Sequence, residues 1–226
     1  MLCNRLTRFE LFPAATRTAL AVAFMFLLGA QSSASEGVAS VAVRVEEDWE
    51  LVLNEPSDAK TCPQFETVMS LTNDRGASYA RVTWNYRESP EFHGAGLQLQ
   101  SWFGDNELDY ESVQENELSS FAETITWTQV LKVSGPTATF AVVNGQSNSW
   151  GTFGDATRTV VLLANEPNVD AYSTDVSAAN CQISYGLNRV AQLRIKEVRR
   201  YDAAGAIIST DTTDRVLYSD TAGAEF

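Results

Sequence analysis

Residues 43–54 read VRVEEDWELVLN, and their period-two alternation decides the fold class. The even positions from Arg44 to Glu50 are charged, whereas the apolar residues stand at odd positions: Val43, Val45, Trp49, Leu51 and Leu53. Successive side chains of a strand point to opposite faces, so this pattern predicts a half-buried β-strand.

Two later segments, Tyr79 to Tyr86 and Leu97 to Phe103, alternate in the same way, and no segment of comparable length shows a helical period. Their apolar faces carry Ala80, Val82, Trp84 and Tyr86 in the first segment and Leu97, Leu99 and Phe103 in the second. The opposite faces carry Arg81, Thr83 and Asn85, and Gln98, Gln100 and Trp102. Both segments are predicted strands with one polar face.

Turn residues separate the strands at short intervals and predict four hairpins. The turns are Asn73 to Gly76, Gly104 to Asn106, Ser134 to Pro136 and Asp202 to Gly205. Residues 144–180 are weakly patterned, and we expect loops there around one strand, Thr159 to Leu163. Many short strands without helical intervals predict an all-β fold, an antiparallel β-sandwich of the jelly-roll type.

The first 34 residues have the pattern of an export signal. Arg5, Arg8 and Arg17 precede or flank an apolar run from Ala19 to Leu28, and small residues follow at 32–34. This pattern predicts a cleaved signal peptide (1–34), one domain (35–220) and a C-terminal tail (221–226). A retained anchor is the alternative, but the run is shorter than the roughly 18 residues that a membrane span needs. We expect a secreted, periplasmic or cell-surface protein with no membrane span after signal removal.

The chain is acidic, with 16 basic and 29 acidic residues. Removal of residues 1–34 takes away three arginines and Glu10, which leaves 13 basic and 28 acidic residues and a net charge of −15. Such a surface repels phosphate backbones, so nucleic acid is not an expected partner.

Two cysteines remain after the predicted cleavage, Cys62 and Cys181. An exported chain lies in a compartment where disulfides persist, so we predict that the two are bonded. Closing a loop of this length stabilises the fold by about 4–5 kcal/mol at most in the loop-entropy model. Two separately buried thiols are the alternative.

Two segments carry a resemblance to a known superfamily. Thr137 to Gly145 is similar to the strand of concanavalin A-like jelly rolls that ends in an Asn-Gly turn, and Gln192 to Asp202 resembles their final core strand. The superfamily contains lectins, laminin G-type modules and glycanases. The mature region also resembles a set of exported bacterial proteins with no assigned function. The resemblance implies a fold more than an activity.

The segment Glu46 to Glu50 resembles the E-x-D-x-E strand of jelly-roll glycanases that retain configuration. The resemblance implies Glu46 as nucleophile, Glu50 as acid/base and Asp48 between them. Retention needs carboxyl groups about 5–5.5 Å apart, whereas residues four apart on a flat strand are about 13 Å apart. Glu47 also stands where the family has an apolar residue. The alternative is a solvated strand face.

A second candidate site is a surface made of Asn85, Gln98, Gln100 and Trp102. Trp150 is added to it because its loop has a sequence similar to the one that starts at Trp102. Amides pair with sugar hydroxyls, and an indole stacks on the C–H face of a sugar ring. The alternative is that both tryptophans are core residues.

Calcium is a third candidate, through Asp105, Asn106 and Asp109. Exported jelly rolls bind it through loop oxygens, but these residues match no defined calcium loop. Acidic turns are the alternative. The chain has one histidine and no phosphate-binding glycine loop, so no other cofactor is expected.

The sequence therefore leaves three hypotheses. The first is a non-catalytic module that binds a glycan or an extracellular matrix component. The second is a retaining glycoside hydrolase. The third is a structural envelope protein with no small ligand.

Overall fold

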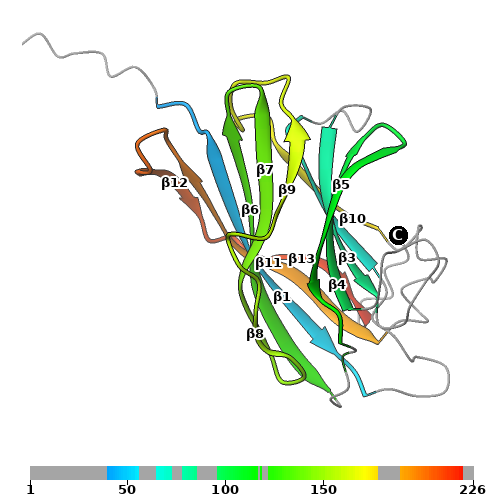
Figure 1. The fold of residues 1–226 in the computed structure, drawn as a ribbon. Helices are drawn as coiled ribbons and strands as arrows, with labels where there is room; N and C mark the ends of the chain where they lie inside the picture. Colours follow the sequence, from blue (N-terminus) through cyan, green and yellow to red (C-terminus); the bar gives the residue numbers. More distant parts are fainter. Residues whose placement is uncertain are drawn as a thin grey trace, which may run out of the picture. The chain divides into compact units, whose positions relative to one another are not determined.

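The computed structural model describes residues 40–55, 65–72, 78–85, 96–116, 118, 122–177 and 189–220, all of which belong to one compact unit, Val38–Phe226. These residues form two β-sheets in which every neighbouring pair of strands is antiparallel. Figure 1 shows the two sheets as facing layers. The predicted all-β sandwich is confirmed. In this part of the chain, no helix is long and apolar enough to cross a membrane.

The larger sheet has eight strands. They are β1 (Arg44–Leu53), β6 (Glu123–Ser134), β7 (Thr137–Ser147), β8 (Gly151–Phe153), β9 (Thr159–Leu163), β11 (Val190–Tyr201), β12 (Ile207–Asp211) and β13 (Arg215–Ser219). Their order is β12-β11-β1-β6-β7-β8, with β13 also paired to β11 and β9 to β7.

The smaller sheet has five strands. They are β2 (Phe65–Ser70), β3 (Ser78–Asn85), β4 (Gly96–Phe103), β5 (Asn106–Gln114) and β10 (Ser173–Ser177). Their order is β10-β2-β3-β4-β5, so β10 and β5 are the edge strands.

The apolar faces of the alternating strands meet between the sheets, as expected. Trp49 and Leu51 of β1 and Val82 and Trp84 of β3 are at most 1% exposed. The ring of Trp127 on β6 stacks on Trp49 at 5.8 Å and lies 4.7 Å from Trp84. Such aromatic pairs add about 0.5–1.5 kcal/mol beyond their buried area. The indoles therefore join the two sheets at the centre of the core.

The four predicted hairpins correspond to antiparallel pairs of consecutive strands: β2–β3, β4–β5, β6–β7 and β11–β12. The strand Thr159–Leu163 is β9, with the predicted bounds. The segment 144–180, expected to be mainly loop, also contains the end of β7, β8 and β10. These strands are too short, or too rich in Ser, Thr and Asp, to give a clear alternation.

Asn144 and Gly145 do not end β7, which continues to Ser147. They form a bulge, because the register with β6 shifts between Thr126 and Thr128. Asn144 has a φ of 56°, a left-handed conformation that asparagine tolerates better than most residues. A Cβ on Gly145 would lie 2.4 Å from the ring of Phe153, so only glycine fits there. An Asn-Gly pair indicates a change of backbone direction, and here that change is a bulge rather than a turn.

Candidate functional site

The outer face of the smaller sheet carries a set of polar and aromatic side chains from β3 and β4. The register pairs Arg81 with Gln100, Thr83 with Gln98 and Tyr79 with Trp102. Of the alternate residues, Ala80, Val82, Trp84, Leu97 and Leu99 belong to the core, whereas Phe103, expected on the same apolar face, is exposed at the end of β4. The structure therefore places Gln98, Gln100 and Trp102 side by side with Arg81 and Thr83. Asn85 lies at the end of β3, opposite Gly96, and its side chain is outside the described residues.

A chain of contacts links β2, β3, β4 and β5 across this face. Arg81 forms an ion pair with Glu66 at 2.8 Å, and its Nε donates to Gln100 Oε1 at 2.6 Å. Gln100 Nε2 donates to Glu107 Oε2 at 2.7 Å, and Thr83 donates to Gln100 Oε1 at 3.2 Å. We call Glu66, Arg81, Gln100 and Glu107 the polar network.

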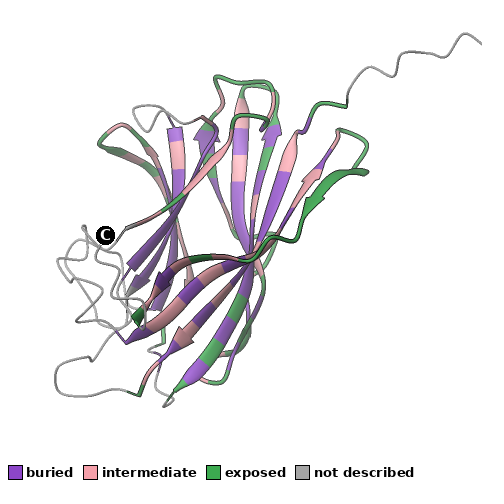
Figure 2. Cartoon of the chain, turned by 180° about the vertical axis from the view of Figure 1, so that it is seen from behind, coloured by how far each residue is buried: buried purple, intermediate pink, exposed green. Residues whose placement is uncertain are grey.

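The amides of this face are buried rather than presented to solvent, as the purple strands of the smaller sheet in Figure 2 illustrate. Gln98 is 1% exposed and Gln100 is 0% exposed. Both polar atoms of the Gln100 amide are already hydrogen-bonded. Alternation predicted which face these residues occupy, but it contains no information on what covers that face. Gln100 is therefore positioned to hold its neighbours in place.

The aromatic residues of this face remain partly exposed. Tyr79 and Trp102 have nearly parallel rings, with 8° between the planes and 6.5 Å between the centroids. The guanidinium of Arg81 lies 4.4 Å from the Trp102 ring centroid, a cation–π contact worth about 0.5–2 kcal/mol. The Tyr79 hydroxyl donates to the carbonyl of Gly104 at 3.4 Å. We call Tyr79 and Trp102 the aromatic platform.

A bulge lies beside the platform without disturbing it. Between β4 and β5 the register shifts at Ser101 and Trp102, because Leu108 is an extra residue on β5. The pairing of β4 with β3 is continuous, so the alternation along β4 is preserved. Trp102 consequently faces away from the core, as predicted.

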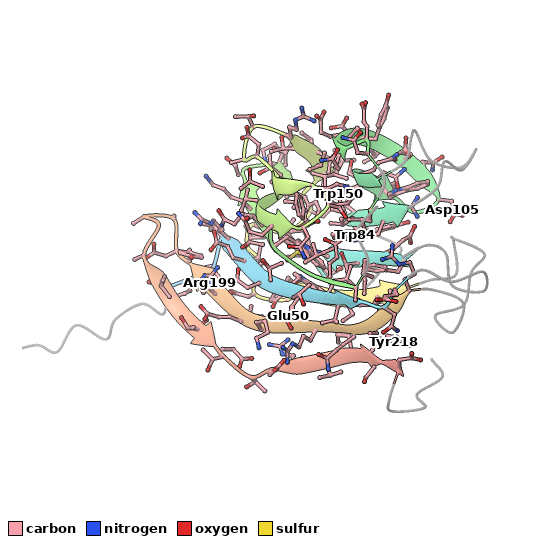
Figure 3. All side chains as sticks on the ribbon, turned by 90° about the horizontal axis from the view of Figure 1, so that it is seen from below. Glu50, Trp84, Asp105, Trp150, Arg199 and Tyr218 are labelled. Carbon is pink, nitrogen blue, oxygen red and sulfur yellow. The ribbon has the colours of Figure 1, made fainter. Side chains whose placement is uncertain are left out.

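Trp150 does not belong to this surface. Its ring stacks on the buried Trp84 at 5.7 Å, and its Nε1 donates to the carbonyl of Asn116 at 2.9 Å. Figure 3 shows Trp150 beside Trp84 within the sandwich. The similar sequences of the two tryptophan loops therefore do not indicate a shared site.

Glu46 and Asp48 lie on the outer face of β1 and share one arginine of β11. Arg199 Nε donates to Glu46 at 3.2 Å, and its Nη1 and Nη2 donate to Asp48 at 2.6 and 2.9 Å. Tyr201 donates to Glu46 at 2.6 Å, and Arg44 also binds Glu46. Burial alone would raise the pKa of Glu46, but the hydrogen bonds from Tyr201, Arg44 and Arg199 together hold it below its usual value.

Glu50, on the same face, is held by a different arginine. Arg194 donates to Glu50 Oε1 through Nε at 2.8 Å and through Nη2, and its Nη1 contacts Asp214 at 3.0 Å. Figure 3 shows Glu50 on the outer side of β1. Glu46, Asp48 and Glu50 thus share a face, as predicted, but each is bound by an arginine.

The three calcium candidates are not clustered by the fold. Asp105 lies in the exposed β4–β5 turn, and Asn106 is the exposed first residue of β5, where its Nδ2 donates to Phe103 O at 3.5 Å. Asp109 lies further along β5 and accepts from the amide of Val161 on β9 at 3.2 Å. Residues four apart on a strand are about 13 Å apart. Within the described ranges, no three His, Cys, Asp or Glu residues are grouped so that they could hold a metal ion.

Sequence reasoning missed the buried acid Glu47. It is 0% exposed, and it accepts hydrogen bonds from Trp49 Nε1 at 3.1 Å and from Thr174 Oγ1. Burial raises its pKa to about 7, although the hydrogen bonds oppose this rise. The signal was available: position 47 has the parity of Val45 and Trp49, so its carboxyl had to face the core.

The predicted disulfide between Cys62 and Cys181, the predicted signal and the predicted tail lie outside the described residues.

No protein-family model, curated protein or solved structure matches this chain.

Proposed function

We propose that the chain is an exported, non-catalytic β-sandwich module that binds carbohydrate through the aromatic platform of Tyr79 and Trp102. The observation that carries this proposal is the contact of a partly exposed indole with a buried guanidinium. The export part rests on the pattern of residues 1–34.

The contacts beneath the platform support binding because they fix its geometry before a ligand arrives. Arg81 is held by Glu66 and Gln100, and its guanidinium lies against Trp102. An aromatic ring fixed in this way loses little side-chain entropy when a sugar stacks on it. The network residues therefore position the platform, whereas Trp102 and Tyr79 contact the ligand. The acidity of the chain favours an uncharged glycan over an anionic one.

The larger sheet supports a non-catalytic function. A retaining hydrolase needs one carboxyl free to protonate the glycosidic oxygen and another free to attack. Arginines form ion pairs with Glu46, Asp48 and Glu50, so a substrate would have to displace an arginine from each carboxylate.

We include the jelly-roll topology of the concanavalin A-like superfamily in this proposal. Its support is the pairing of β1 with β11, two strands far apart in the sequence, inside the larger sheet.

A glycan array tests the proposal, with purified wild-type protein beside Trp102→Ala and Phe103→Ala. Phe103 is the matched control because it is the next residue on β4, is also aromatic and is 42% exposed. We expect saturable binding by the wild type and by Phe103→Ala, and loss of binding in Trp102→Ala. Binding by a folded Trp102→Ala protein, or no binding by the wild type, would contradict the proposal.

A further inference from the structure

One segment crosses from the larger sheet to the smaller sheet and ends in an edge strand. The amide of Val169 donates to the carbonyl of Ala42 at 2.8 Å, next to β1, and Tyr172 N donates to Val169 O at 3.2 Å. The chain then enters β10, which pairs only with β2 in the described sheet. We call Val169–Tyr172 the crossover segment. The attachment of β10 therefore depends on how this segment is held.

Glu47 of β1 holds the crossover segment and the start of β10 from inside the sandwich. Its carboxyl accepts hydrogen bonds from Thr174 of β10 and from Trp49 on its own strand, and the phenol of Tyr172 in the crossover segment lies near enough to favour its ionised form. All three of these groups are neutral. No ion pair to Glu47 is found among the described residues, so an ionised carboxylate here would be buried without a compensating cation in contact.

The neighbouring strand presents a buried acceptor that lacks a donor. Gln129 of β6 lies directly opposite Glu47 in the register. Its Nε2 donates to Thr67 Oγ1 of β2 at 2.5 Å, whereas its Oε1 is buried and accepts no hydrogen bond from the residues that the structure describes. Directly opposed side chains are about 5 Å apart at Cβ. A proton on Glu47 would supply a donor beside this unsatisfied acceptor.

The charged and titratable groups around Glu47 come from three elements. Tyr172 is in the crossover segment, Arg200 of β11 lies 5.1 Å from the Tyr172 ring, and Arg215 of β13 is paired with Asp211 at 2.6 Å. β6 and β2 contribute only the neutral Gln129 and Thr67. Arg215 favours the ionised carboxylate, but burial outweighs it and raises the pKa of Glu47 to about 7.

Tyr172 remains a hydrogen-bond donor throughout the pH range in which Glu47 titrates. Burial and the neighbouring Glu47 raise the pKa of the Tyr172 phenol to about 12. The proton that enters or leaves this cluster near neutral pH is therefore carried by the Glu47 carboxyl and exchanged with water.

We propose that Glu47 is a proton-controlled anchor for the crossover segment and β10. With the carboxyl protonated, the cluster holds β10 on the smaller sheet. With the carboxyl ionised, opening of β10 becomes easier, because opening returns the charge to water. Opening would leave the edge of β2 unpaired and available to another strand. This inference is independent of the glycan-binding proposal.

Hydrogen exchange of the full chain tests the anchor. Protection factors, corrected for the intrinsic exchange rate, are measured for the amides of β10 at pH 5 and pH 8, in wild type and in Glu47→Gln. Glutamine keeps the shape of the side chain and cannot ionise. We expect β10 protection in the wild type to fall by roughly one to two orders of magnitude from pH 5 to pH 8, and to stay constant in Glu47→Gln. The amides of the central strand β7 exchange by unfolding of the whole domain, so they should remain better protected than those of β10 at both pH values.

Three results would overturn the proposal: constant β10 protection in the wild type, the same pH dependence in Glu47→Gln, or β10 protection equal to that of β7 at both pH values, which would mean that β10 opens only when the whole domain unfolds. If Glu47→Gln does not fold, the carbon chemical shift of the Glu47 carboxyl in the wild type decides. A titration midpoint near neutral pH, together with the loss of β10 protection at the same pH, supports the anchor. A titration midpoint at the ordinary value for glutamate would contradict the proposed anchor.

Discussion

The outer faces of the two sheets carry similar residues in different surroundings. On the larger sheet, Arg194 and Glu50 form an ion pair with side chains that are 24% and 18% exposed. On the smaller sheet, Arg81 and Glu66 form an ion pair with side chains that are only 6% and 2% exposed, beneath an aromatic ring. The first pair is partly solvated, whereas the second is buried and holds the aromatic platform in place. Burial, rather than residue type, separates a solvated face from a preorganised one.

The largest effect is expected from Arg81→Met, which removes one partner of the buried pair. Glu66 would lose its buried ion pair with Arg81, and Gln100 would lose a donor, so the free energy of unfolding should fall by about 3–5 kcal/mol. Urea denaturation measures this change. Arg194→Met is the matched control, and it should cost about 1 kcal/mol or less. Equal losses in the two variants would show that the two pairs do not differ in energy.

The next effect concerns pH and compares Glu47 with its outward-facing neighbours. The native state keeps the Glu47 proton up to a pKa of about 7, whereas the unfolded chain releases it near 4.5. Between these values the native state binds more protons, so stability falls as pH rises. Denaturation at pH 5 and pH 8 should differ by about 2–3 kcal/mol, and Glu47→Gln should remove most of this difference. Asp211, with a pKa of about 2, titrates outside this window. A wild type that gains stability over the same range would contradict the prediction.

The smallest effect is expected from Glu50→Gln. The pair with Arg194 is partly solvated, so its loss should cost about 0–1 kcal/mol. Glycan binding should be unchanged, and the protein should release no reducing sugar before or after the substitution. Hydrolysis of a β-glucan that is lost in Glu50→Gln would restore the hydrolase hypothesis.

Alternation predicted the strands and their facing, because burial of one sheet face imposes a period of two on the residues. It predicted the strands that correspond to β1, β3 and β4, and it predicted that Trp102 lies on the polar face of its strand. It did not predict β10 or β13, which are short and lie at the edges of their sheets, so that few residues carry the pattern.

The candidate site was only partly predictable. The pattern identified the residues that share a face, but the burial of Gln98 and Gln100 depends on what lies over that face. Arg194 and Arg199, which bind the three acids on the outer face of β1, come from β11, about 150 residues further along the chain. Local sequence does not determine which distant strands pair. Glu47 was predictable from its parity.

The aromatic platform is the central claim, and a titration followed through the tryptophan indoles tests it most directly. Protein labelled with ¹⁵N at tryptophan is titrated with linear hexasaccharides of glucose, mannose and N-acetylglucosamine, and each indole signal is assigned by a Trp→Phe variant. We predict that one of these ligands shifts the Trp102 signal saturably, while the signals of the buried Trp84 and Trp127 stay in place. A Trp102 signal that responds to none of them, or a shift confined to another indole, would contradict the claim.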